Sequence, residues 1–195
     1  KTGGVFTMAL ADDPETLDPA TMSGSPEGRI AFNIFEGLMM SGPTTEGLAD
    51  AKDLVVPGAA ASHTLSEDGK VYTFKIRENA KWSDGSPVTA EDFVYSIQRV
   101  QNPETAAKYA NILYPIKNAE KANKGEVPID QLGIKAVDAK TLEITLERPT
   151  PFFLQLLAHY TALPLSKANF EKFGDQFVKP GNMVSNGAFK LEAHV

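Results

Sequence analysis

The sequence contains no cysteine and no long apolar run. Without cysteine there can be no disulfide, no thiolate nucleophile and no cysteine-ligated zinc site. Apolar runs such as Leu54–Val56 and Phe152–Leu154 span only a few residues, whereas a membrane-spanning helix needs about 20. These absences exclude a disulfide-stapled scaffold, a cysteine enzyme and a membrane-spanning helix from these residues.

Basic residues are too few and too scattered to form a positively charged face. The 19 Lys and Arg stand against 25 Asp and Glu, which gives a formal net charge of −6. Because neutralisation of phosphates dominates affinity for nucleic acids, we expect no nucleic-acid partner. The 195 residues, of which 42% are hydrophobic and 23% charged, are typical of a soluble globular chain that folds without a metal.

The spacing of apolar residues, Gly and Pro predicts strands and helices in mixed order. We expect strands at 5–10, 38–40, 60–65, 70–77, 132–137, 141–146 and 187–191. We expect helices from Pro26 to Phe35 and from Thr89 to Gln101, then at 104–113, 115–124, 151–158 and 166–173. Asp68-Gly69 closes a hairpin, and Asp92 completes a variant of the capping box after Thr89.

The order of these elements does not alternate regularly between strand and helix. A simple doubly wound parallel sheet is therefore not indicated, and the sequence predicts a mixed α/β fold. Residues 41–58 are rich in Gly, Pro, Thr and Asp, which indicates a surface crossing or a domain boundary.

No pattern typical of catalysis or metal binding is present. His63, His159 and His194 share no helical spacing, so we expect no metal site and no cofactor. His159 follows an apolar helix and is better explained as a packed side chain than as a metal ligand. The sequence also lacks a nucleophile elbow and a phosphate-binding loop.

Clustered carboxylates favour structural roles. Glu91 and Asp92 are neighbours on a helix and point in different directions, so they cannot form the facing pair of a glycosidase; capping the helix is the better explanation. Calcium binding is the weaker alternative for an acidic group near the start of the chain, because that group lacks the ligand pattern of a calcium loop. Its members are Asp12, Asp13, Glu15 and Asp18.

Several aromatic residues lie in expected loops or at the ends of elements. Rings with polar tips suit binding clefts, because they combine an apolar face with a hydrogen-bonding group. The alternative is packing in the core, which we favour for Trp82; the other members of this group are Tyr109, Tyr114 and Tyr160. Taken alone, the residues predict a soluble α/β domain without visible catalytic apparatus.

One long segment carries a specific resemblance. Residues 77–96 read Arg-Glu-Asn-Ala-Lys-Trp-Ser-Asp-Gly-Ser-Pro-Val-Thr-Ala-Glu-Asp-Phe-Val-Tyr-Ser. This stretch resembles the signature of the peptide-binding family, family 5, of the solute-binding proteins of ABC transporters. Further landmarks follow in the family's order at 17–19, 35–38 and 186–191, and residues 132–138 and 171–175 resemble its oligopeptide-binding branch.

The resemblance implies a type II-like periplasmic binding protein fold, with two lobes around a cleft and a small domain inserted into the first lobe. Residues 1–45 correspond to the start of lobe one, 46–169 to the inserted α/β domain and 170–195 to the return into lobe one. Members of the family are more than twice as long, so the resemblance implies that the second lobe is absent from this chain. A start at Lys1 without an initiator Met suits a processed exported protein, and equally a boundary within a longer sequence.

The same resemblance implies a receptor that breaks no bond. It would capture short peptides in the cleft by backbone pairing, close over them and deliver them to the membrane permease of an ABC importer. It implies a monomer in the periplasm or another extracytoplasmic location, with a lipid-anchored precursor as one form. Open alternatives are a family receptor for a nickel complex, a sugar or a murein peptide, a cell-envelope hydrolase, and a chaperone-like protein.

The resemblance also assigns candidate ligand contacts. They are Met22, Ser23, Gly24, Ser25, Tyr109 and His159. The first four match a loop along the ligand backbone, Tyr109 matches a cleft tyrosine of the inserted domain, and His159 a histidine near a side-chain pocket. Ser23 departs from the family pattern, which has an acidic residue there, so a shifted preference for ligand charge or length is expected. The nearby acid Glu27 could compensate for the charge that is missing at Ser23, although we expect it to cap the helix after Pro26.

Overall fold

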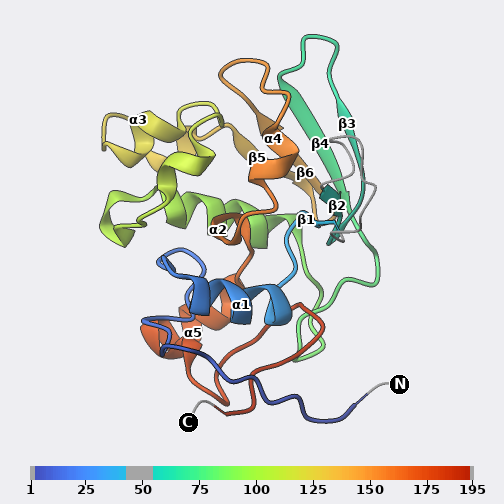
Figure 1. Cartoon of the computed structure of the whole chain (residues 1–195). Coiled ribbons are helices and arrows are strands. Elements are labelled where there is room, and N and C mark those ends of the chain that lie inside the picture. The colour runs from blue at the N-terminus through green and yellow to red at the C-terminus, as the bar shows by residue number, and fades with distance from the viewer. Residues whose placement is uncertain (1–2, 43–54, 194–195) are drawn as a thin grey trace.

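The computed structural model describes residues 3–42 and 55–193 (Figure 1). The strands are β1 (Met39–Ser41), β2 (Val55–Pro57), β3 (Ala60–Leu65), β4 (Val71–Ile76), β5 (Ile134–Asp138) and β6 (Thr141–Thr145). The α-helices are α1 (Ser25–Ile34), α2 (Ala90–Gln101), α3 (Ala119–Asn123), α4 (Phe153–Leu156) and α5 (Lys167–Phe173). Short 3-10 turns are η2 (Pro103–Thr105), η3 (Ala110–Leu113), η4 (Ile129–Gln131), η5 (Tyr160–Ala162) and η6 (Gly174–Val178). The fold is mixed α/β, as the sequence predicts.

A four-stranded antiparallel sheet in the order β3-β4-β6-β5 forms the middle of the chain. The predicted hairpin is confirmed: β3 and β4 are joined by a turn in which Gly69 has φ of +69°, a conformation that glycine adopts without strain. Alternate residues of the central strands are buried, and Tyr72 and Phe74 of β4 lie opposite Ile144 and Leu142 of β6. This alternation, strict in β4, indicates a sheet with one face in the core.

Helix α2 packs against β5 and β6 with an apolar stripe of Phe93, Ile97 and Val100. Its predicted start is confirmed, because the amide of Thr89 donates to Oδ2 of Asp92 (2.9 Å) and the Thr89 hydroxyl donates to the same oxygen (3.0 Å). The helix ends one residue before Asn102-Pro103, also as predicted.

The segments near the two ends of the chain both run along the bottom of Figure 1, below α1. The amide of Gly187 donates to the carbonyl of Ile34 (2.8 Å). The side chain of Asn186 accepts from the amide of Glu36 (3.0 Å) and donates to its carbonyl (2.8 Å). Segments about 150 residues apart are thereby joined at the end of α1.

The strands predicted at 5–10 and 187–191 are wrong. Residues 5–10 run as largely exposed coil, with only the ring of Phe6 packed against that of Phe189 (centroids 5.6 Å apart). The amides of residues 187 and 189 bond to the end of α1 instead of to a neighbouring strand. A β-favouring run becomes a strand only where a partner strand supplies its hydrogen bonds.

Three predicted helices are shorter than expected. The stretch 104–113 breaks into η2 and η3 at Ala106, whose φ is +52°, and 115–124 contains only α3, which begins after Asn118 at φ +63°. The helix predicted at 151–158 is reduced to α4. The start of α5 at Ser166 and its end at Gly174 agree with prediction.

Some predictions fall partly or wholly outside the described residues. Most of the crossing at 41–58 and His194 lie there. The domain boundaries at 46 and 170 stay a prediction. Within 3–42 and 55–193, no helix is long and apolar enough to cross a membrane.

Candidate ligand-binding site

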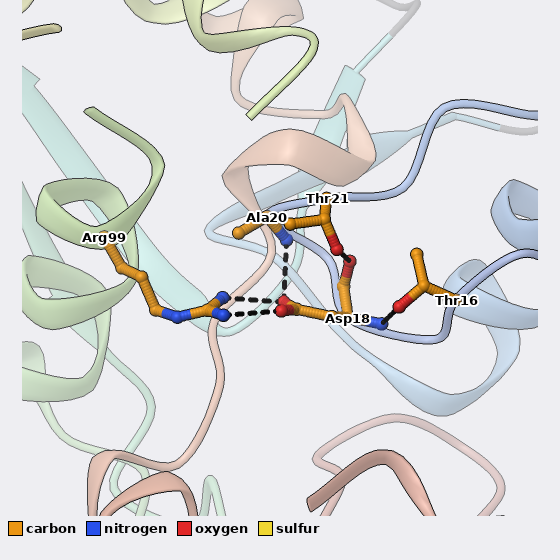
Figure 2. A network of polar contacts seen from close by, with 5 residues as sticks. All are labelled: Thr16, Asp18, Ala20, Thr21 and Arg99. Carbon is orange, nitrogen blue, oxygen red and sulfur yellow. Dashed lines mark hydrogen bonds and ion pairs between the residues drawn. The ribbon is translucent and has the colours of Figure 1, made fainter. Parts of the chain in front are cut away.

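The loop that carries the first candidate residues is anchored to α2 by a buried ion pair, which Figure 2 shows. The guanidinium of Arg99 donates to both carboxylate oxygens of Asp18, at 2.8 Å and 2.6 Å. Only 12% of the Arg99 side chain and 10% of the Asp18 side chain are exposed. The planar fork of arginine matches a carboxylate in this two-point geometry, so the pair fixes orientation as well as position.

Asp18 also organises the backbone around itself. Its amide donates to the hydroxyl of Thr16 (3.1 Å), and its Oδ1 accepts from the amide of Ala20 (3.0 Å). Its carbonyl accepts from the amides of Thr21 and Met22, both at 3.0 Å. The residues that precede the loop at 22–25 therefore form a compact turn attached to α2.

The candidate loop is exposed unevenly. Met22 belongs to the core, with 1% of its surface exposed, while Ser23 and Gly24 are half-buried and Ser25 is exposed. In the described part of the chain, the amide groups of Ser23 and Gly24 have no hydrogen-bond acceptor. Among the described residues, Ser23 and Gly24 thus carry backbone donors without an acceptor, whereas Met22 serves the fold.

Tyr109 and its neighbour Lys108 both reach Ser23, although they lie far along the chain. The Tyr109 hydroxyl makes a long contact of 3.4 Å to the Ser23 carbonyl. The ammonium group of Lys108 donates to the Ser23 hydroxyl (2.9 Å) and to Oε2 of Glu15 (3.2 Å). The structure therefore brings Tyr109 and Ser23 together and adds Lys108, which the sequence analysis did not single out.

An aromatic cluster surrounds two further candidates, Tyr109 and His159. The ring of Tyr109 lies 5.6 Å from His159 and 6.0 Å from Tyr160, and His159 lies 4.1 Å from Tyr160, between centroids. Phe32 of α1 flanks Tyr160 at 6.4 Å. Gly28 of α1 faces the Tyr160 ring, and a Cβ there would make an ordinary contact of 3.5 Å with Cδ1 of that ring. The cluster joins α1, η3 and η5 into one surface.

Burial keeps two groups of this cluster, His159 and Tyr160, electrically neutral near pH 7. Burial lowers the pKa of His159 below its ordinary value, so its imidazole is uncharged. The Nδ1 atom of His159 accepts from the amide of Thr161 (3.2 Å), which fixes the ring. Burial raises the pKa of Tyr160 to about 12, with Tyr109 and Glu27 adding to the effect. The cluster thus offers apolar faces and uncharged hydrogen-bonding groups.

Glu27 lies beneath the loop. It is 3% exposed, and its Oε1 accepts from the amide of Glu15 (2.9 Å). Its Oε2 has no partner among the described residues, and a Cβ added to Gly24 would come within 2.2 Å of that atom. Glu27 lies in the first turn of α1, where a negative charge favours the helix dipole, although no side-chain hydrogen bond caps this helix at Gly24.

The other residues considered from the sequence have structural surroundings. Trp82 is buried, as predicted, and its Nε1 donates to Asp92 (3.2 Å). The Tyr114 hydroxyl donates to Asn123 (2.8 Å), outside the cluster. Of the acidic group near the start, Asp18 is held by Arg99 and Glu15 contacts Lys108. Within the described ranges, no group of three or more His, Asp or Glu is arranged for a metal.

Two open depressions, of about 370 and 280 Å³, lie along the Asp18–Arg99 pair. Phe170, whose ring stacks under the Arg99 guanidinium (4.4 Å), lines the larger one. Neither depression includes any of the candidate residues. The candidate residues thus lie on a surface outside both depressions.

Comparison with known proteins places these features in context. The profile of the bacterial extracellular solute-binding proteins, family 5 (middle region), matches residues 55–195. The periplasmic oligopeptide-binding protein OppA of Escherichia coli K12 is 45% identical over 180 residues, which cover 91% of this chain and 32% of that protein. The periplasmic murein peptide-binding protein MppA of the same organism is 43% identical over 188 residues (95% and 33%).

A solved structure adds the three-dimensional likeness. The crystal structure of Haemophilus influenzae OppA in complex with RPPGFSPFR matches with a TM-score of 0.85 and 38% identity, over 93% of this chain and 34% of that one. The chain therefore spans about a third of the length of the relatives that it matches.

Proposed function

The chain belongs to the bacterial extracellular solute-binding proteins of family 5, and on this premise we propose that it is part of a receptor for short peptides. The receptor acts outside the cytoplasm, in the periplasm or an equivalent compartment, and delivers its ligand as a monomer to the permease of an ABC importer. The observation that carries the proposal is the convergence of the Ser23–Gly24 backbone, Tyr109 and His159 on one open surface. The oligopeptide-binding relatives support the choice of ligand.

The proposal assigns the two ends of the chain, 1–45 and 170–195, to lobe one and residues 46–169 to an inserted domain. The position of both terminal segments at the bottom of Figure 1, below α1, supports this division. The contacts of Asn186 with Glu36 support it as well. In this proposal a second lobe supplies the opposing wall of the cleft; the chain matches about a third of the length of its relatives.

Binding is proposed to depend on the ligand backbone more than on its side chains. The free amides of Ser23 and Gly24 can donate to ligand carbonyls in the manner of an added strand. The rings of Tyr109, His159 and Tyr160 can pack on varied side chains, with water filling the remaining space. Such a site favours peptides as a class and tolerates many sequences.

We further propose that the receptor does not cleave its ligand. The hydroxyl of Thr161 contacts the histidine of the site, with its Oγ1 2.9 Å from Nδ1 of His159. Thr161 is 2% exposed, so a ligand cannot reach this hydroxyl as it would reach a nucleophile. The pair instead fixes the imidazole ring.

The test is calorimetry of the intact protein with alanine peptides of increasing length, followed by mass analysis of the recovered ligand. We expect saturable heat for short peptides and recovery of uncleaved ligand. Binding of a nickel chelate or a sugar with no heat from peptides would refute the proposal, and cleaved ligand would indicate a hydrolase. Binding restricted to unfolded chains would indicate a chaperone-like role.

A second candidate ligand is a murein peptide, because the murein peptide-binding protein is 43% identical to this chain. Competition between a murein tripeptide and an ordinary tripeptide for the intact protein separates the two. Preference for the ordinary peptide supports the general receptor, and preference for the murein peptide supports the specialised one.

A further inference from the structure

Lys108 is an exposed cation that touches the candidate site. Its ammonium group contacts only the Ser23 hydroxyl (2.9 Å) and Glu15 (3.2 Å) among the described residues. The side chains of Lys108 and Glu15 are 58% and 72% exposed. An exposed pair of this kind is held weakly, because water competes for both partners and both long side chains lose freedom when they meet.

The charges around Ser23 leave Lys108 as the group that an anionic ligand would meet. On the cluster side, His159, Tyr109 and Tyr160 contribute rings, and burial keeps the imidazole neutral. Beneath the loop, the carboxylate of Glu27 is buried and turned toward Gly24, away from solvent.

Ser23 itself bears no charge. An acidic side chain at this position would lie against the ammonium group and neutralise it, because the Ser23 hydroxyl is already 2.9 Å from Nζ. With serine there, an ammonium group has three donors, of which the protein occupies two, and both are exchangeable. The neighbouring amides of Ser23 and Gly24 are further donors without protein acceptors among the described residues.

We propose that Lys108 determines ligand specificity by binding a carboxylate of the peptide at Ser23. This inference rests on the proposed peptide-receptor function and narrows it to ligands that place an anionic group there. The carboxylate displaces the exposed side chain of Glu15 and accepts from Nζ of Lys108 in a charge-assisted hydrogen bond. It can come from the C-terminus of the peptide or from an acidic side chain, and the chemistry at Lys108 is the same.

The position of this carboxylate follows from the adjacency of Lys108 and Tyr109 in the sequence. Lys108 and Tyr109 are consecutive and both reach Ser23. A ligand that packs on the Tyr109 ring therefore places its neighbouring group within reach of Lys108. Because the Lys108 side chain is long and largely exposed, it can follow ligands of somewhat different length.

The test compares Lys108→Met with the wild type in the intact protein, by calorimetry. One arm uses alanine peptides with a free C-terminus and the same peptides with a C-terminal amide. A second arm uses amidated peptides that contain Glu or Gln at one position. We expect the wild type to favour the carboxylate form in one arm by about tenfold, which is typical of a charge-assisted hydrogen bond in a partly exposed site.

In Lys108→Met this preference should fall to about twofold or less. Ser23→Glu should remove the same preference by supplying a competing carboxylate. The matched control is Lys124→Met: Lys124 is similarly exposed (53%) and contacts Glu120 on α3, not the site, so its preference should equal that of the wild type.

The outcomes separate this inference from the proposed function. If the wild type binds peptides without a preference for a carboxylate, or if Lys108→Met keeps the full preference, Lys108 is not a specificity residue although the receptor stands. If the wild type binds no peptide in either arm, the proposed function itself fails. Circular dichroism of each variant establishes that the fold is intact.

Discussion

The most demanding prediction concerns Asp18→Asn. Asn keeps an oxygen for the amide of Ala20 but removes the charge that pairs with Arg99, whose side chain is only 12% exposed. It also turns a donor toward the guanidinium, which has no acceptor of its own. Breaking a buried pair by removing one partner costs about 3–5 kcal/mol, because the remaining charge is left without compensation. Since Asn preserves the Ala20 bond, we expect the lower end, about 3 kcal/mol.

The assay is denaturant-induced unfolding of the intact protein carrying Asp18→Asn, Arg99→Met or both. In the thermodynamic cycle, the double variant should cost less than the sum of the single variants by about 2 kcal/mol, because the second change removes the uncompensated charge. The control is Glu120→Gln, which breaks the exposed pair with Lys124 and should cost less than about 0.5 kcal/mol.

The prediction extends to the site. The turn that Asp18 organises leads directly to Met22 and Ser23, so ligand affinity should fall in Asp18→Asn beyond what unfolding explains. A stability loss below about 0.5 kcal/mol, or additive costs in the cycle, would refute the view that this pair anchors the loop.

Three further outcomes are expected. Tyr109→Ala should weaken peptide binding by roughly 1–3 kcal/mol in calorimetry, because the ring is lost. Tyr109→Phe should stay close to the wild type, because the hydroxyl contact is long (3.4 Å), and an unchanged affinity in the alanine variant would show that Tyr109 is not part of the site. Gly24→Ala should destabilise by about 1–3 kcal/mol, because its Cβ would meet Oε2 of Glu27 at 2.2 Å, whereas Gly28→Ala, with ordinary contacts of 3.5 Å inside a helix, should be neutral or stabilising; equal denaturation midpoints for the two variants contradict this. The pKa of His159, measured by nuclear magnetic resonance, should lie below its ordinary value of 6.5, and a midpoint at or above 6.5 would contradict its burial. The unfolded chain takes up the proton at higher pH than the folded one, so the contribution of His159 to stability is complete above about pH 6.5 and is lost as pH falls toward the lowered pKa.

The elements that the sequence predicts well are those whose signals are local. The β3–β4 hairpin depends on alternating residues and on Asp68-Gly69, and α2 depends on Thr89, Asp92 and a following Asn102-Pro103. Each signal lies within a few residues of the element that it specifies. The helices predicted at 104–113 and 115–124 do not form in full, because Ala106 and Asn118 adopt a left-handed backbone conformation that interrupts them. No local signal marks these breaks, since neither residue is a glycine.

Strands at 5–10 and 187–191 could not be judged from the sequence alone. Both have β-favouring residues, but a strand also requires a neighbour, and the choice of neighbour is a long-range property. In the structure the amides at 187 and 189 find their acceptors at the end of α1, about 150 residues away.

The candidate site, like the fold, could be predicted only in part from the sequence. Resemblance proposes Ser23, Tyr109 and His159, and the structure brings them close together. Lys108 was missed because its contact with Ser23 joins positions 85 residues apart and no local pattern marks it. A charged residue next to a candidate tyrosine was the available signal, and only the fold shows where it points.

The central claim is that these residues belong to a peptide receptor. It is tested most directly by mass spectrometry of the ligand released from the intact protein after purification from its native host under mild conditions. We predict a mixture of short, uncleaved peptides of varied sequence. A nickel complex, a sugar or another solute in place of peptides would contradict the account.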